Sequence, residues 1–212
     1  IVANTSAPTF ANTIEALERS GRLLSQVSGV FYNLTGTVST PELRAAEREL
    51  APLMAQHRNR IVLDAKLFAR IDDLHGRRAR LKLDDEQMRV LERTHRNLVR
   101  AGAALSAAKK KRVAAINERL ATLSTTFAQN VLADEQAFQL VLESEADLAG
   151  LPDFARSAAS RLANDLGHPG KHVVSLARSS IETFLQFSAR ADLRAKAFEA
   201  WTRRGEMGGA SD

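Results

Sequence analysis

Hydrophobic residues near the start of the chain recur at helical spacing in two successive groups. The first group is Phe10, Ile14 and Leu17, and the second is Leu23, Leu24, Val27, Val30, Phe31 and Leu34. Asn12 and Glu15 have the spacing of a capping box, and Gly21 follows where a first helix needs a left-handed exit. The pattern predicts a short helix that ends at Gly21 and leads into a longer apolar helix.

Capping residues divide the middle of the chain into further helices. Thr40 before Pro41 predicts a helix start, because the hydroxyl can cap the helix and proline suits its first position. Residues 43–63 then give one helical face, and residues 64–82 continue as helix, either directly or after a slight break. The inward side of that second stretch is expected to carry Leu67, Phe68, Ile71 and Leu74.

Two more helices follow along the chain. Asp84 and Gln87 have the spacing of a capping pair, and the apolar stripe that begins at Met88 closes at Gly102. Ser106 opens the longest predicted helix, whose apolar residues follow each other at steps of three and four. They are Val113, Ile116, Leu120, Leu123, Phe127 and Val131.

The hydrophobic period changes after this long helix. The segment AFQLVLES (residues 137–144) follows the strand period of two, and HVVSLA (residues 172–177) is a second strand candidate. A helix is predicted between them at residues 152–166, and two more are predicted at residues 180–188 and 192–203. The pattern leaves open whether the two strands pair, and in which direction.

Together these elements predict a mainly α fold, a multi-helix array with one small β element of two short strands flanking a helix in the final third. We expect residues 1–134 to form an N-terminal helical part. We expect residues 135–212 to hold the strand-helix-strand element and two further helices. The glycine-rich GEMGGASD at residues 205–212 is predicted to be a linker.

Composition narrows the class of protein without naming a function. The 212 residues include 44% hydrophobic and 26% charged residues, which suits a globular protein. The chain has no cysteine, which excludes disulfides and thiolate chemistry and fits the reducing cytoplasm. No apolar run reaches the ~20 residues of a membrane-spanning helix, so we expect no membrane partner. The start, IVANTSAPTF, lacks methionine and a signal-peptide pattern, so we expect the chain to begin inside a longer gene product.

Basic residues exceed acidic ones, 30 to 25, which gives a formal net charge of +5. They cluster at two places, one comprising Arg77, Arg78, Arg80 and Lys82 and the other Lys109, Lys110, Lys111 and Arg112. Such clusters either bind an acidic partner or form solvated helix faces, and we favour the solvated faces. No aromatic residues are interleaved with them, so we expect no nucleic-acid partner.

The histidines of the chain do not form the metal motif of a zinc peptidase, which needs HExxH on a helix. The five histidines are His57, His75, His95, His168 and His172, and none precedes a glutamate. His168 and His172 are four residues apart, but Pro169 and Gly170 lie between them, so a surface turn is favoured over a metal site. His57 and His95 fall on apolar stripes and are predicted to be buried and hydrogen-bonded.

Other catalytic patterns are missing as well. Adjacent carboxylates occur at residues 72–73 and 84–85, but neighbours on a helix point in different directions, so helix capping is favoured over acid–base catalysis. The sequence has neither GxSxG nor a glycine-rich phosphate loop. We therefore predict no catalytic, cofactor-binding or metal-binding residue in this chain.

The order of sequence blocks resembles a known family. PTFANTIEALERSG (residues 8–21) and VSGVFYNLTGTVSTPEL (27–43) are similar to the N-terminal region of the thimet-oligopeptidase-like zinc metallopeptidases, most closely their bacterial peptidyl-dipeptidase branch. The long block from LDAKLFARIDDLHG to TTFAQNVL (63–132), LAGLP (148–152) and ADLRAKAFEAWTRRG (191–205) continue the match. The resemblance covers essentially the whole chain.

This resemblance implies a cytoplasmic enzyme that releases C-terminal dipeptides from short unfolded peptides. It implies a zinc ion in the parent enzyme, none bound by this chain, and catalytic residues in a C-terminal half that lies downstream. The chain itself would form one wall of the substrate channel and would be inactive alone. The alternatives are part of an endo-acting oligopeptidase of the same family, or a stand-alone helical module that binds an acidic partner.

An incomplete channel has a physical consequence. Apolar surface that normally meets the other half would be exposed, and exposed apolar patches promote association. We therefore expect the isolated chain to associate with itself.

Overall fold

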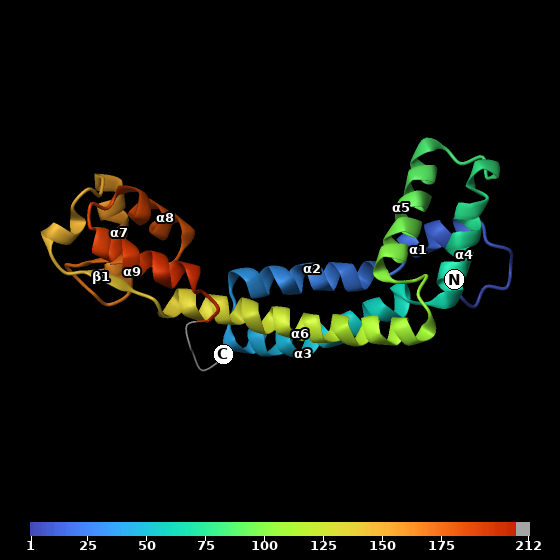
Figure 1. The fold of residues 1–212 in the computed structure, drawn as a ribbon, viewed down its shortest axis with the longest axis horizontal. Helices are drawn as coiled ribbons and strands as arrows, with labels where there is room; N and C mark the ends of the chain where they lie inside the picture. Colours follow the sequence, from blue (N-terminus) through green and yellow to red (C-terminus); the bar gives the residue numbers. More distant parts are fainter. Residues whose placement is uncertain (207–212) are drawn as a thin grey trace. The chain divides into compact units, whose positions relative to one another are not determined.

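The computed structural model describes residues 1–206, and most of them are helical. The elements in the first part are a π-helical turn η1 (Phe10–Glu15), α1 (Ala16–Glu18), α2 (Arg22–Thr37), α3 (Pro41–Val62), α4 (Ala65–Gly76), a 3-10 turn η2 (Arg78–Arg80), α5 (Asp85–Ala101) and α6 (Ala107–Ala137). They are followed by β1 (Leu140–Leu142), a 3-10 turn η3 (Glu145–Leu148), α7 (Asp153–Asp165), β2 (His172–Val174), α8 (Arg178–Phe187) and α9 (Ala191–Thr202). Figure 1 shows this order along the chain. The predicted mainly α fold with one small β element is confirmed.

The chain divides into two compact units, Ile1–Thr125 and Thr126–Asp212. The division falls within α6, the longest of the described helices. The two parts expected from the sequence, residues 1–134 and 135–212, stay a prediction. The expected linker at residues 205–212 lies outside the described residues from 207 onward.

Capping side chains set several helix ends in the first unit. Thr40 accepts a hydrogen bond from the backbone of Leu43 and precedes Pro41, and Asp84 forms the predicted capping box with Gln87. Gly102 ends α5 with a left-handed φ of 101°, as predicted.

The first cap differs from the prediction. Thr9, not Asn12, is the N-cap of η1, and Asn12 occupies the third helical position of that capping box. The Thr9 hydroxyl accepts from the Asn12 amide at 3.1 Å, while Asn12 Oδ1 accepts from the Thr9 amide at 2.9 Å. The expected Asn12–Glu15 pair was therefore placed three residues too late, because threonine and asparagine can exchange these two roles.

An apolar cluster holds η1, α4 and α5 together. Its buried members are Ile14, Leu67, Ile71, Leu74, Leu91, Leu98 and Ala103. Phe68, which was also predicted to point inward, is only partly buried at the edge of this cluster. Arg70 on α4 fastens the N-terminal segment by donating to the carbonyl oxygens of Asn4 and Ser6 and to Asn12 Oδ1.

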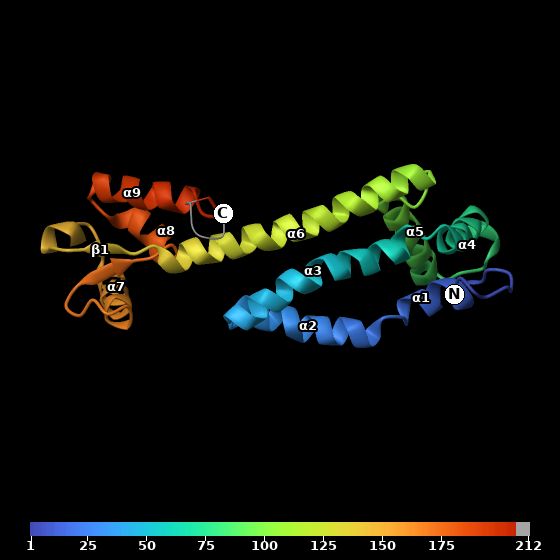
Figure 2. The ribbon, with the colours of Figure 1, turned by 90° about the horizontal axis from the view of Figure 1, so that it is seen from below.

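Helices α2 and α3 form a hairpin (Figures 1 and 2). The turn begins where the amides of Val38 and Ser39 both donate to the carbonyl of Leu34, and α3 starts at Pro41. The buried side chains on these two helices are polar, Thr35 and Asn59. The hairpin therefore contributes little to an apolar core.

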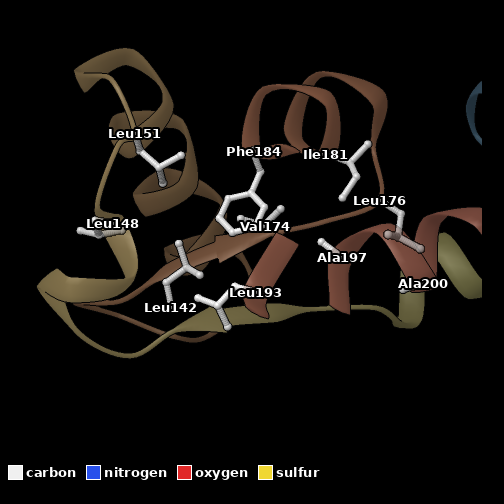
Figure 3. Packing of buried hydrophobic residues seen from close by; sticks show 10 residues of the cluster. All are labelled: Leu142, Leu148, Leu151, Val174, Leu176, Ile181, Phe184, Leu193, Ala197 and Ala200. Atoms are coloured by element: carbon white, nitrogen blue, oxygen red, sulfur yellow. The ribbon is translucent and has the colours of Figure 1, made fainter. Parts of the chain in front are cut away.

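The second unit is built around two paired strands. Strands β1 and β2 are antiparallel, with Val141 opposite Val173, which settles the pairing that the sequence left open. Both strands are three residues long, shorter than the predicted segments. Side chains from the strands and from η3, α8 and α9 pack together in Figure 3, and this cluster comprises Leu142, Leu148, Leu151, Val174, Leu176, Ile181, Phe184, Leu193, Ala197 and Ala200.

Candidate functional site

The long helices of the first unit carry exposed apolar side chains. Leu23, at the start of α2, is 74% exposed, although leucine is usually buried. Other apolar side chains on these helices are exposed as well. They are Leu24, Val27, Val30 and Leu34 on α2, Leu50, Leu53 and Ile61 on α3, and Ile116, Leu120 and Leu123 on α6. Apolar stripes of this size are typical of surfaces that another protein segment covers.

Polar side chains join α3 to the first part of α6. The buried amide of Asn59 donates to the carbonyl oxygen of Ala114 at 3.2 Å and accepts from Asn117 Nδ2 at 2.8 Å. One turn away, Gln56 Nε2 donates to Glu118 at 3.3 Å. These contacts form one side of a shallow groove of about 390 Å³, whose other lining residues include Arg60, Leu63, Lys110 and Lys111.

The two basic clusters differ in their surroundings. Arg77 donates to Asp73 and to the carbonyl oxygen of Pro8, and Arg78 donates to Glu92 and to the carbonyl oxygen of His75. These two arginines are half-buried and connect elements of the first unit, whereas Arg80 and Lys82 of the same cluster are exposed, as a solvated face requires. The side chains of residues 109–112 make no hydrogen bond or ion pair with the described part of the chain.

His95 and His75 stack face to face between α5 and α4. Their ring centroids are 3.9 Å apart with an interplanar angle of 1°, and His95 also stacks on Phe68. His95 Nε2 contacts Asp72 Oδ1 at 2.9 Å, so the predicted hydrogen bond of His95 is present, but the side chain is only partly buried and not buried as predicted. Burial and the neighbouring imidazole and Arg78 lower the pKa of His75, while Glu92 and Asp72 oppose this effect.

His57 does not fit its prediction, because it is exposed on α3. Its apolar neighbours on the same face, including Leu50 and Leu53, are exposed as well. The helical stripe was recognised correctly, but a stripe alone does not identify which partner covers it. The prediction of a buried His57 is therefore wrong.

The other proposed polar sites have structural roles or remain separate. His168 lies in a turn and its Nε2 contacts Gln139 Oε1 at 2.9 Å. Of the carboxylate pairs, Asp84 caps a helix as expected, whereas Asp72 contacts His95 and Asp73 pairs with Arg77 in mid-helix. Helix capping is thus a wrong interpretation of residues 72 and 73.

Zinc chemistry has no fit in the described residues. The sequence has no HExxH, and residues 1–206 bring together no group of three or more His, Asp or Glu side chains that could hold a metal ion. A catalytic zinc site needs three protein ligands around an open position. No zinc-dependent catalytic step is therefore assigned to the side chains of residues 1–206.

The second unit contains a groove of about 440 Å³ that the sequence patterns did not predict. It lies among α7, β2 and α8, and it is lined by apolar residues and four hydroxyl side chains. Phe154 and Phe187 meet edge to face near it, with ring centroids 6.2 Å apart and both rings exposed. Three alanines at helical spacing, Ala155, Ala158 and Ala159, were the signal in the sequence, because small residues leave room on a helix face.

Arg190 is a second feature that the sequence analysis missed. It precedes α9, where it forms an ion pair with Asp147 and a bidentate pair with Asp192 at 2.8 and 3.0 Å. Hydrogen bonding to Arg190 lowers the pKa of Asp192 to about 2. Burial raises the pKa of Asp147, but hydrogen bonds from Ser144 and Glu143 and the charge of Arg190 outweigh it, so the net direction is downward.

Comparisons with known proteins find relatives that match the whole length of the chain. Residues 2–110 match the family model for the neurolysin/thimet oligopeptidase N-terminal domain. The whole chain aligns at 34% identity with the dipeptidyl carboxypeptidases of Escherichia coli and Salmonella typhimurium, and covers 31% of each. Oligopeptidase A of Escherichia coli is 24% identical over 96% of the chain, which covers 30% of that protein. The chain thus spans about a third of the length of these relatives.

None of the described helices is both long enough and apolar enough to cross a membrane.

The family model covers more than half of the chain, so the resemblance noted in the sequence is confirmed. The chain therefore belongs to the neurolysin/thimet oligopeptidase family, and its residues 2–110 match the N-terminal domain of that family.

Proposed function

We propose that this chain is the N-terminal wall of a peptide channel in a zinc metallopeptidase that releases dipeptides from the C-terminus of short peptides. The observation that carries this proposal is the difference in identity among relatives. The chain is 34% identical to dipeptidyl carboxypeptidases over its full length, but 23–27% identical to the matched oligopeptidases A. The absence of HExxH from the sequence agrees with a role in the wall.

The proposed partner of the exposed helices is the remaining, catalytic part of such an enzyme. The chain covers 31% of each dipeptidyl carboxypeptidase, so the larger share of those relatives has no counterpart in it. The apolar side chains of α2, including Val27 at 58% and Val30 at 64% exposure, offer a surface for that share to cover. Burying each such side chain contributes roughly 1.5–3 kcal/mol, which is enough for a few of them to hold two halves together.

A chimera tests the proposal. This chain replaces the aligned N-terminal 31% of the Escherichia coli dipeptidyl carboxypeptidase, and the products from a short peptide are identified by mass spectrometry. We expect successive dipeptides from the C-terminus, and a loss of activity when the metal is chelated. The isolated chain is expected to hydrolyse nothing, because no metal site fits its described residues.

Substitutions on α2 test whether this helix contacts the catalytic part of the enzyme or has no role in its activity. Val27→Asp/Val30→Asp should prevent assembly of the active chimera, since two carboxylates would be buried against the catalytic part. Asn97→Asp/Gln136→Asp adds the same charge at exposed polar positions of α5 and α6, outside the apolar face of α2, and should leave activity nearly unchanged. Cleavage at internal bonds would instead indicate an oligopeptidase. A folded chimera without activity, or equal effects of the two variants, would contradict the proposed wall.

A further inference from the structure

We infer that the groove between α3 and the first turns of α6 binds an acidic segment of peptide. Three cations, Arg60, Lys110 and Lys111, line the groove, and they come from two helices that the Asn59 contacts hold together. Lys109 and Arg112 extend the positive surface along α6. The only carboxylate among the described lining residues is Glu118, which Gln56 binds at 3.3 Å.

Helix stability does not explain the charge of α6 at this point. The first turn of α6 has no acidic residue, and four consecutive cations begin at its third position. Cations near a helix N-terminus oppose the helix dipole by about 0.3–1 kcal/mol each. Arg60 differs, because it lies in the last turn of α3, where a cation is favourable. The unfavourable placement of residues 109–112 points to a role outside the helix itself.

The other basic cluster has its own acidic partners. Arg77 and Arg78 are held by Asp73 and Glu92, so their charge is largely satisfied within the first unit. Side chains 109–112 have no such partner among the described residues. In the first cluster only Arg80 and Lys82 lack such a partner among the described residues, whereas at the groove all four cations are available for a ligand.

The form of the groove favours a peptide over a nucleic acid. Its lining contains amides, alkyl chains and cations but no aromatic ring, so bases have nothing to stack on. Three separated cations suit several carboxylates spaced along an extended segment better than one. The idea that a peptide substrate occupies this groove rests on the proposed function. Binding of an acidic peptide to the groove, in contrast, can be measured without any peptidase activity.

Binding to the isolated chain is therefore the test. A labelled hexaglutamate peptide with an amidated C-terminus is titrated by fluorescence anisotropy at low and high salt. We expect salt-sensitive binding that weakens about tenfold in Lys110→Ala/Lys111→Ala. Lys66→Ala/Arg89→Ala removes the same charge from exposed positions on α4 and α5, and should change affinity by less than about twofold. Circular dichroism shows that each variant is folded.

A gain of affinity provides a second readout that misfolding would not produce. Glu118→Gln removes the carboxylate of the groove but keeps an amide for Gln56, so it should bind hexaglutamate a few-fold more tightly. Equal losses in both double variants would indicate a diffuse effect of net charge and overturn the inference. So would binding no stronger than that of hexaglutamine, or tighter binding of an oligonucleotide of equal charge. These results leave the proposed function untouched, since the chimera measures it separately.

Discussion

The second unit buries its apolar residues, whereas the hairpin of α2 and α3 exposes them. In the second unit, Leu176, Ile181 and Ala197 have no exposed surface. In the hairpin, Leu23 is 74% and Leu53 56% exposed, and the buried side chains are Thr35 and Asn59. Both regions are mostly helical, and among their described α-helices only α3 has a side-chain N-cap. Secondary structure and burial are therefore set by different features of this sequence.

Local signals are enough to form the helices of the hairpin. Thr40 and Pro41 start α3, and Gly21 allows the chain to enter α2 with a left-handed φ of 72°. Such signals act within a few residues and do not depend on what covers the helix face. The cluster in the second unit depends instead on side chains that lie far apart in the sequence, such as Leu142 and Ala197. The difference leads to opposite expectations for equivalent substitutions.

The largest expected effect on folding stability comes from one substitution made in both regions. Leu176→Ala should lower the free energy of unfolding by about 2–5 kcal/mol, because it leaves a cavity in the cluster of the second unit. Leu23→Ala should change it by less than about 0.5 kcal/mol, because the side chain is exposed. Urea unfolding followed by circular dichroism measures both values. Similar losses would mean that α2 is covered in solution, which would remove the contrast.

Glycine-to-alanine substitutions should have opposite signs in the two regions. Gly150 has φ of 85°, and an added Cβ would lie 2.3 Å from the carbonyl oxygen of Phe187, so Gly150→Ala should cost about 2–3 kcal/mol. Gly29 lies inside α2 with nothing within 4 Å of an added Cβ, so Gly29→Ala should stabilise the chain by about 0.5–1 kcal/mol. Thermal unfolding of both variants gives the signs. Destabilisation by Gly29→Ala would show a close contact on α2.

The sequence predicted helix boundaries better than burial. Thr40 and Asp84 were identified as caps because a cap involves residues only three positions apart. His57 was expected to be buried and is exposed, because a stripe of apolar residues does not reveal whether its partner is present. The pairing of Arg190 with Asp147 was overlooked because the two residues are 43 positions apart. Contacts between distant residues leave no periodic signal.

Self-association tests whether the exposed apolar side chains of α2 bind a second copy of the chain. We propose that the isolated chain forms a reversible dimer through α2, so its sedimentation coefficient should rise with concentration. Leu23→Ser/Val27→Ser should weaken the dimer by about a hundredfold or more, because the loss of two buried apolar side chains costs about 3–6 kcal/mol. Ser25→Ala/Gln26→Ala, at exposed polar positions of the same helix, serves as the control. A monomer at every concentration would contradict the proposed dimer and would mean that the exposed face of the hairpin is stable in water without a partner.

The smallest effect concerns the polar contacts that complete the second unit. Because Arg190 lowers the pKa of Asp192 to about 2, the ionised carboxylate stabilises the fold above its ordinary pKa near 3.8. That contribution is lost as the pH falls from about 3.8 to about 2, since the unfolded chain then binds the proton first. In Arg190→Gln the pKa of Asp192 should return toward its ordinary value, which carboxyl NMR titration measures directly. An unchanged pKa in this variant would mean that the start of α9, rather than Arg190, holds the carboxylate ionised.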